Sequence, residues 1–348
     1  MNEPENNEQH QSSTGSLFLK FVTVIVLLIV LVAGSSFLWI YSYSRTPGPN
    51  GPSEVVVIIP PGSSFRQITT ILADAGLIHE DIRFALIARF LGLSGKVQAG
   101  EFLLTAGTTP VNVLQALIKA KPLQHPVTVV EGLTAREIAA VFAEKDWCSA
   151  SDFLALVHDQ AFIASLGLKN ISSLEGYLYP DTYYLTRIPR FSAEKIVRTM
   201  VQRFFVVWEQ LGADRKNMHD TVILASIVEK ETGDASERAR IASVFTNRLK
   251  IGMRLQSDPT VIYGIEGFNG NITRDDLKRK HPYNTYVIRG MPAGPICNPG
   301  KAALFAALNP AKEKYLYFVS KNDGTHYFST TLEEHNRAVR KYQKRRRK

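Results

Sequence analysis

Two glutamates at the end of one apolar helical pattern are the residues of this chain best suited to acid–base chemistry. Leu224, Ile227 and Val228 recur at positions i, i+3 and i+4, and the next position of that stripe is Glu231. Glu229 lies about 200° away around the helix axis, on another side. Because burial disfavours a charged carboxylate, we expect a raised pKa for Glu231, as a general acid needs near neutral pH.

A structural ion pair is the alternative for Glu231, since buried acidic residues are usually paired. The available cations are Arg238, Arg240 and Arg248. The segments that follow favour chemistry instead. They cover 254–263, 283–286 and 290–300 and are rich in amides, hydroxyls and aromatic rings, with few charges. Such a mixture suits a sugar-binding groove, and long loops inside a compact domain are more often functional than not.

The elements around the glutamates predict a mixed α+β domain. Residues 150–215 have a mostly helical pattern, and strong helical patterns cover 219–232 and 235–251. A Gly/Pro/Asn-rich stretch then fills 256–300. Strands at 315–319 and 326–329 are expected to pair across a Lys-Asn-Asp-Gly turn, before a last helix at 332–344.

A smaller α+β module is predicted for 55–125. Strands at 55–59 and 99–104 enclose helical patterns that begin near 65 and 81, and a further helix covers 111–120. This strand–helix–helix–strand order resembles the LysM-like domain that binds cell-wall glycan. The strand at 127–130 starts a similar unit, in which a strand turns at glycine and a Ser or Thr precedes the helix as N-cap.

An uncharged run from Phe21 to Tyr43 predicts a membrane anchor over 17–43, because it is long enough to cross a bilayer of about 30 Å. A cleaved signal peptide is the alternative. It fits poorly, since the run is long and the tail at 1–16 is acidic. Lys20 and Arg45 give almost no orientation signal. A Pro/Gly linker at 44–54 follows.

The formal net charge of +9 comes almost entirely from the C-terminal tail, where residues 337–348 hold eight basic side chains and no acid. Such a tail is typically solvated or tethered to an anionic membrane or wall polymer, and nucleic acid is disfavoured because no nucleic-acid-binding motif accompanies it. Cys148 and Cys297 leave open one disulfide or two free thiols. No zinc spacing is present, so no metal or cofactor is implied.

Seven motifs resemble those of the endolytic murein transglycosylase family, also called MltG or YceG-like, in the family's order. They are EGYLYPDTY at 175–183, ASIVEKET at 225–232, ASER at 235–238, VFTNRL at 244–249, GMRLQSDPTVIY at 252–263, YNTY at 283–286 and GPICNPG at 294–300. The resemblance covers nearly the whole chain. It implies an N-terminal transmembrane helix, a LysM-like module at 55–125, a catalytic domain at 126–336 with a central helix, and a tail at 337–348.

The family's catalytic glutamate precedes Ser or Thr, as in other lytic transglycosylases and goose-type lysozymes, and this maps onto Glu231-Thr232. The resemblance implies cleavage between N-acetylmuramic acid and N-acetylglucosamine, with 1,6-anhydro ends as products. It places the catalytic part outside the cytoplasmic membrane, near peptidoglycan glycan strands and possible synthase partners. Candidate glycan-holding residues are Glu229, Tyr179, Asp181, Gln256, Asp258, Tyr263, Asn284, Tyr286 and Asn298.

Two other functions remain open at this stage. A hydrolase would use Asp258 or Asp181 as a second carboxylate beside Glu231, because ordinary glycosidases flank the bond with two. A non-catalytic wall-binding scaffold of the division or elongation machinery would need no carboxylate. A 1,6-anhydro product would distinguish a lytic transglycosylase from the hydrolase. Cleavage of glycan of either kind would distinguish an enzyme from the non-catalytic scaffold.

Overall fold

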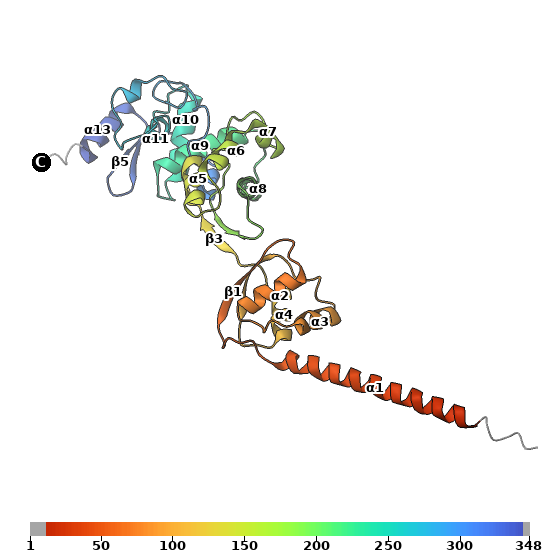
Figure 1. The fold of residues 1–348 in the computed structure, drawn as a ribbon. Coiled ribbons are helices and arrows are strands. Elements are labelled where there is room, and N and C mark those ends of the chain that lie inside the picture. Colours follow the sequence, from red (N-terminus) through yellow and green to blue (C-terminus); the bar gives the residue numbers. More distant parts are fainter. Residues whose placement is uncertain (1–11, 344–348) are drawn as a thin grey trace, which may run out of the picture. The chain divides into compact units, whose positions relative to one another are not determined.

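The structure, a computed structural model, describes residues 12–343 (Figure 1). These residues form two compact units. Unit 1 contains the residues up to Gln124 together with Thr186–Pro189, and unit 2 contains His125–Leu185 and the chain from Arg190 onward. The predicted tail at 1–16 therefore lies mostly outside the described residues, as does the end of the basic tail at 337–348.

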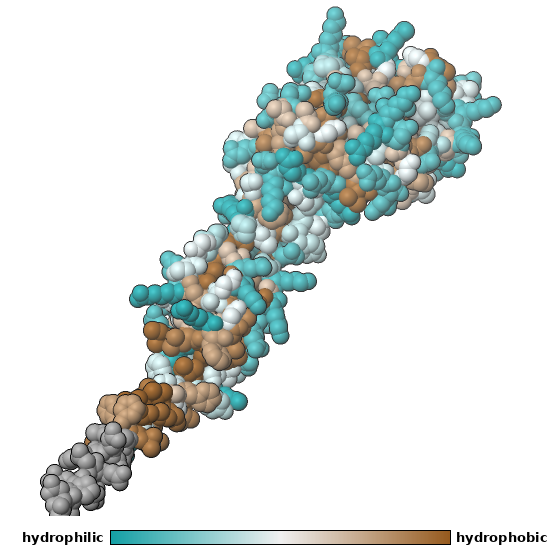
Figure 2. All heavy atoms as spheres, turned by 90° about the vertical axis from the view of Figure 1, so that its right-hand side faces the viewer, coloured by the Kyte–Doolittle hydropathy of each residue, from teal (hydrophilic) through white to brown (hydrophobic). Residues whose placement is uncertain are grey.

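Helix α1 (Ser12–Arg45) contains the predicted anchor. Its segment Leu17–Arg45 is the one helix in the described part of the chain that is long and apolar enough to cross a membrane. Figure 2 shows hydrophobic side chains on the part of α1 that is visible in that view, and Leu31 and Phe37 are among the side chains of this helix that protein leaves uncovered. A covering of lipid accounts for such side chains better than water does.

The rest of unit 1 confirms the predicted strand–helix–helix–strand order. Its elements are β1 (Glu54–Ile59), α2 (Phe65–Asp74), α3 (Ile82–Phe90), β2 (Gly100–Thr105) and α4 (Pro110–Lys119). Strands β1 and β2 are antiparallel, with Val57 opposite Phe102, and both of these side chains are in the core. Ser64 forms a complete capping box with Gln67 at the start of α2, as the predicted N-cap requires.

Unit 2 places α9 at its centre, against α10, α11 and α12. The elements before it are β3 (His125–Thr128), α5 (Ala135–Glu144), α6 (Ala150–His158), α7 (Gln160–Ser165), β4 (Thr182–Leu185) and α8 (Ala193–Gln210). From α9 onward they are α9 (Met218–Glu231), α10 (Arg238–Lys250), α11 (Asp258–Tyr263), η1 (Asp276–Lys278), α12 (Lys301–Leu308), β5 (Tyr317–Ser320), β6 (His326–Ser329) and α13 (Leu332–Tyr342). The predicted β5–β6 hairpin is confirmed.

Three elements differ from the sequence-based expectation. Helix α11 interrupts the stretch expected to be a loop, with Pro259 in its first turn, where the missing amide hydrogen costs nothing. Strand β4 pairs with β3 within the stretch 150–215, which was expected to be mostly helical, and β3 itself ends at Thr128 rather than Val130. Each element has only four to six residues, too few to establish a hydrophobic period.

Helix α9 is buried on all sides rather than along one stripe. Every residue from Val222 to Val228 is buried, including the side of Ala225 and Ser226 that sequence periodicity left for Glu229. Its surroundings come from α10, which follows it directly, and from α11 and α12, which lie further along the chain. Both glutamates at its end therefore emerge from the protein interior.

We expect Phe204→Ala to lower the free energy of unfolding by about 3–5 kcal/mol. Phe204 is fully buried on α8 and its ring contacts Tyr177 and Trp208, so truncation leaves a cavity. Phe305→Ala is the matched control, because Phe305 is 55% exposed, and it should change stability by no more than about 0.5 kcal/mol. Urea unfolding of the whole chain, followed by tryptophan fluorescence, measures both. Equal midpoints for the two variants would contradict this packing.

Candidate active site

Glu231 is the last residue of α9 and is only partly exposed. The Ser257 hydroxyl donates a hydrogen bond of 2.5 Å to Glu231 Oε1. Burial raises the pKa of Glu231, and the neighbouring Asp258 carboxylate raises it further. The Ser257 hydrogen bond and the positive charges of His326 and Arg248 act in the opposite direction, but the pKa stays above its usual value.

None of the three arginines considered as ion-pair partners neutralises Glu231. Arg238 lies 3.6 Å from Glu229, and Arg240 lies 3.3 Å from Glu313. Arg248 donates to the carbonyls of Leu316 and Leu255, at 2.7 and 2.5 Å. The ion-pair alternative for Glu231 is therefore wrong, and a carboxyl group with a raised pKa is left beside a hydroxyl.

Glu229 has a different environment two residues earlier. Its Oε2 accepts a hydrogen bond of 2.9 Å from the Gly300 backbone amide, and its Oε1 lies near the Arg238 guanidinium. Burial raises the pKa of Glu229, and the Gly300 amide and Arg238 lower it. Because one Glu229 oxygen faces a cation and the other accepts a hydrogen bond from a backbone amide, this side chain is better suited to holding neighbouring segments in place than to donating a proton.

Two segments far apart in sequence are joined beside Glu231. Ser257 donates its amide to Thr285 Oγ1 at 3.0 Å, and the Thr285 and Thr260 hydroxyls are 2.8 Å apart. The Tyr286 hydroxyl donates to Asp258 Oδ1 at 2.6 Å. These bonds bring together three of the predicted glycan-holding residues, Asp258, Tyr286 and Gln256. Gln256 and Asp258 are exposed, and Tyr286 is half-buried.

Asn284 and Asn298 were predicted to hold glycan, but the structure gives them internal partners. Asn284 is 2% exposed, and its amide nitrogen donates to three backbone carbonyls at 276, 277 and 279. Asn298 is fully buried. Its Oδ1 accepts from the amides of Gly176 and Leu178, and its Nδ2 donates to Leu133 and Glu175. No donor or acceptor of the Asn298 side chain is left for a sugar.

A third carboxylate, Glu175, was not predicted as a site residue. It is 4% exposed and accepts hydrogen bonds from the Ala135 amide, the Tyr263 hydroxyl at 3.1 Å and Asn298 Nδ2 at 2.7 Å. Burial, opposed by these bonds, raises its pKa to about 7. Its only sequence signal was its place at the start of the EGYLYPDTY motif, because hydrophobic periodicity does not reveal a buried loop acid.

The other predicted residues have partners of their own. Tyr263 bonds Glu175, so its hydroxyl is occupied internally. Asp181 forms an ion pair of 2.6 Å with Arg203, and Tyr179 is 7% exposed. Asp181 is thus neutralised, which leaves Asp258 as the better placed of the two suggested second carboxylates. Cys148 and Cys297 are both free thiols, and Cys297 is buried against the Ser226 carbonyl.

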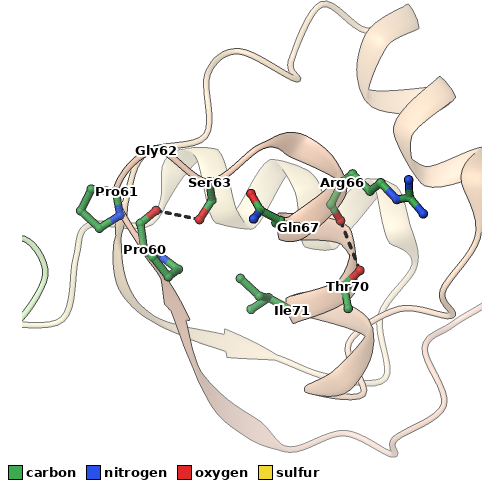
Figure 3. Close-up of a pocket in the computed structure, with 8 residues that line it drawn as sticks. All are labelled: Pro60, Pro61, Gly62, Ser63, Arg66, Gln67, Thr70 and Ile71. Carbon is green, nitrogen blue, oxygen red and sulfur yellow. Dashed lines mark hydrogen bonds between the residues drawn. The ribbon is translucent and has the colours of Figure 1, made fainter.

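Among the surface hollows of the described residues are two that Glu231 does not line. One, of about 470 Å³, lies in unit 1 between the β1–α2 turn and the outer side of α2 (Figure 3). Pro60, Ser63 and Gln67 are among its lining residues. The other, of about 430 Å³, lies in unit 2 and is lined by Lys280, His281, Pro282, Val287 and Ile288. The residues that line this second hollow lie on both sides of Thr285 and Tyr286 in the sequence.

The acid Glu175 predicts a difference in the pH dependence of stability. Its pKa rises from 4.5 in the unfolded chain to about 7 in the fold, so its stabilising contribution is complete below about pH 4.5 and is lost as the pH rises through about 7. Glu175→Gln cannot ionise. Relative to this variant, the wild type should lose about 3 kcal/mol of stability between those limits.

Urea unfolding at a series of pH values measures this difference. Glu144→Gln is the matched control, because Glu144 is exposed on α5, and its curve should run parallel to that of the wild type. Parallel curves for Glu175→Gln as well would show that Glu175 titrates as an ordinary exposed acid.

Comparison with known proteins places this geometry in a family. The YceG-like family model matches residues 57–341. An endolytic murein transglycosylase of Bacillus subtilis is 35% identical over 330 residues, which is 90% of this chain and 91% of that protein. A second endolytic murein transglycosylase, from Streptococcus pneumoniae, is 29% identical over 91% of this chain and 64% of its own length.

A solved structure agrees with the sequence comparison. The crystal structure of a YceG-like protein from Listeria monocytogenes superposes with a TM-score of 0.55 and 34% identity, covering 83% of this chain and all of that one. The family model spans the two-glutamate end of α9, the joined segments around Ser257 and Thr285, and the Glu175 motif. The chain belongs to the YceG-like family.

Proposed function

We propose that this chain is a membrane-anchored endolytic murein transglycosylase in which the Glu231 carboxyl group is both acid and base. The observation that carries the proposal is that Glu231 has a raised pKa and pairs with no cation of residues 12–343, although three arginines lie in the surrounding sequence. The names of the Bacillus and Streptococcus relatives support the substrate and the reaction type.

The reaction begins with Glu231 protonated. The carboxyl group gives its proton to the oxygen that links N-acetylmuramic acid to N-acetylglucosamine, and the bond from C1 to that oxygen breaks. The 6-hydroxyl of the same muramic acid attacks C1, and its proton passes to the Glu231 carboxylate. The product has a 1,6-anhydro end, no water is consumed, and Glu231 is protonated again for the next cycle.

An internal hydroxyl removes the need for a second carboxylate, which ordinary glycosidases use as nucleophile or as base for water. Asp258 lies near enough to raise the pKa of Glu231, and the Tyr286 hydroxyl is bonded to it. We assign to Asp258 a role in keeping Glu231 protonated. Gln256, Asp258 and Tyr286 form the polar surface on which the glycan rests beside the acid.

The module in unit 1 is proposed to be a LysM-like glycan-binding domain. Its hollow combines the apolar surfaces of Pro60, Pro61 and Ile71 with polar side chains at Ser63, Gln67 and Thr70 (Figure 3). Sugars present both apolar faces and hydroxyl groups, so a hollow of this composition fits a short stretch of glycan. Binding there would raise the local concentration of strands for the catalytic unit.

The anchor is proposed to cross the cytoplasmic membrane once, with the units that follow α1 on the outer side, where murein is assembled. One helix of sufficient length supports a single-pass anchor. Peptidoglycan synthases, which make the strands that such an enzyme cuts, are the expected protein partners. Anionic lipid or wall polymer is the expected contact of the basic residues after Arg337.

Glu231→Gln is expected to reduce murein cleavage by about 10²–10⁴-fold, because glutamine cannot transfer the proton. Glu229→Gln is the matched control on the same helix and should retain turnover, since Glu229 holds Gly300 and Arg238. Mass spectrometry of digests in ¹⁸O-labelled water measures both variants and the products. The wild type should leave anhydro ends free of the label. Labelled reducing ends would indicate hydrolysis, and a fully active Glu231→Gln variant would refute the assignment.

Ser257→Ala is expected to move the alkaline limb of the pH profile of kcat/KM to higher pH. The Ser257 hydrogen bond lowers the pKa of Glu231, so its loss lets the acid remain protonated further into the alkaline range. Ser236→Ala is the matched control, because Ser236 is exposed and its hydroxyl bonds Asp234 instead. An unchanged limb in Ser257→Ala would show that the titrating group is not Glu231.

A further inference from the structure

The C-terminal end of α1 is built into the core of unit 1. The Tyr43 ring is 3% exposed, and its hydroxyl donates to the His79 carbonyl at 2.7 Å. Arg83, at the start of α3, lies over the rings of both Trp39 and Tyr43 and donates to the Trp39 carbonyl at 3.0 Å. Asp81 holds the same guanidinium at 2.7 Å. The start of α3 is therefore fixed beside Trp39.

Trp39 marks the level of the bilayer surface. The apolar segment that precedes it from Leu17 is long enough, at about 1.5 Å per residue, to cross a hydrocarbon core of about 30 Å. Tryptophan at the end of such a helix favours the headgroup region. Since Arg83 contacts Trp39, α3 begins at that level.

Helix α3 exposes an apolar stripe that nothing in the described residues covers. Its inner side, with Phe84, Ile87 and Ala88, belongs to the core of unit 1. Its outer side carries Ile82, Leu86 and Phe90 at i, i+4 and i+8, and these side chains are 69%, 40% and 93% exposed. Figure 2 shows hydrophobic side chains over the part of unit 1 close to α1. Exposed stripes of this kind mark interaction surfaces.

The charges of the same segment indicate which partner fits. Residues 82–100 contain Arg83, Arg89 and Lys96 and no acidic residue. Apolar side chains combined with basic ones, and without acids, are typical of helices that lie in the interface of an anionic bilayer. A protein partner has no comparable reason to exclude acids from this whole segment.

We propose that the outer face of α3, formed by Ile82, Leu86 and Phe90, lies in the headgroup region of the bilayer that α1 spans. This second membrane contact, with Arg89 and Lys96 toward anionic phosphates, fixes the orientation of the unit 1 module on the membrane. The proposal rests on α1 as a membrane anchor and is independent of the chemistry assigned to Glu231.

Fluorescence quenching in vesicles tests the proposal with the full chain. The chain carries Cys148→Ser, so that Cys297, which is buried, is the remaining native thiol. Phe90→Cys is labelled with an environment-sensitive dye and reconstituted into vesicles of phosphatidylcholine and phosphatidylglycerol that contain nitroxide-labelled headgroups. Arg66→Cys is the matched exposed position at the start of α2, whose other end is bonded to Asn50, in the linker after α1.

We expect quenching to be several-fold stronger at position 90 than at position 66, and the emission of the label at position 90 to be blue-shifted. The quenching and the blue shift at position 90 should both decrease when phosphatidylglycerol is omitted. Solvent-like emission at both positions would overturn the proposal, as would equal quenching at both. Ser35→Cys, within α1, distinguishes the two failures. If the label at position 35 is quenched and the label at position 90 is solvent-like, the α3 contact alone is refuted. If the labels at positions 35 and 90 are both solvent-like, the anchor is refuted.

Discussion

The site depends on one constraint, which is that the Glu231 carboxyl group leaves the protein interior without an ion pair to any cation in the described part of the chain. Seven consecutive buried residues of α9 lead to Glu229 and Glu231. The nearby arginines are engaged by Glu229, by Glu313 and by backbone carbonyls. Glu231 retains only a hydroxyl donor at Ser257. Desolvation therefore sets its proton affinity, and a proton held in this way is available for transfer to a leaving oxygen.

The same constraint explains why so many polar residues around the site are buried. The Ser257 amide and the Thr260 hydroxyl both bond the Thr285 hydroxyl, so the 256–260 and 284–286 segments are held together beside Glu231. The amide of Asn284 ties the second of these segments to the carbonyls at 276–279. On the other side of α9, Asn298 links Glu175 to the 176–178 backbone, and Gly300 follows closely enough to bind Glu229. The buried amides position the segments, and the exposed polar groups are left for the glycan.

The sequence was sufficient for the outline of this fold, but not for the partners of the polar residues around Glu231. Ser64 and Thr134 were recognisable as N-caps because capping is a local interaction, and both form complete capping boxes. Asn298 was predicted to hold glycan because its partners, Leu133 and the 175–178 segment, lie far from it in the chain. The carbonyls that bind Asn284 lie at 276–279, close in sequence, but they face its amide only through the irregular path of the loop, which has no periodic pattern. The buried acid Glu175 was missed because its partners Ala135, Tyr263 and Asn298 lie far from it in sequence.

The proton affinity of Glu231 in the folded chain is the central quantity, and it can be measured without substrate. Carbon-13 NMR of the glutamate carboxyl groups, with the Glu231 resonance assigned by its absence from Glu231→Gln protein, follows the ionisation directly. We expect this resonance to titrate at higher pH than is usual for a glutamate side chain, because burial raises the pKa of Glu231. Titration together with the exposed glutamates would contradict it, because such a carboxyl group would be ionised when the glycan arrives.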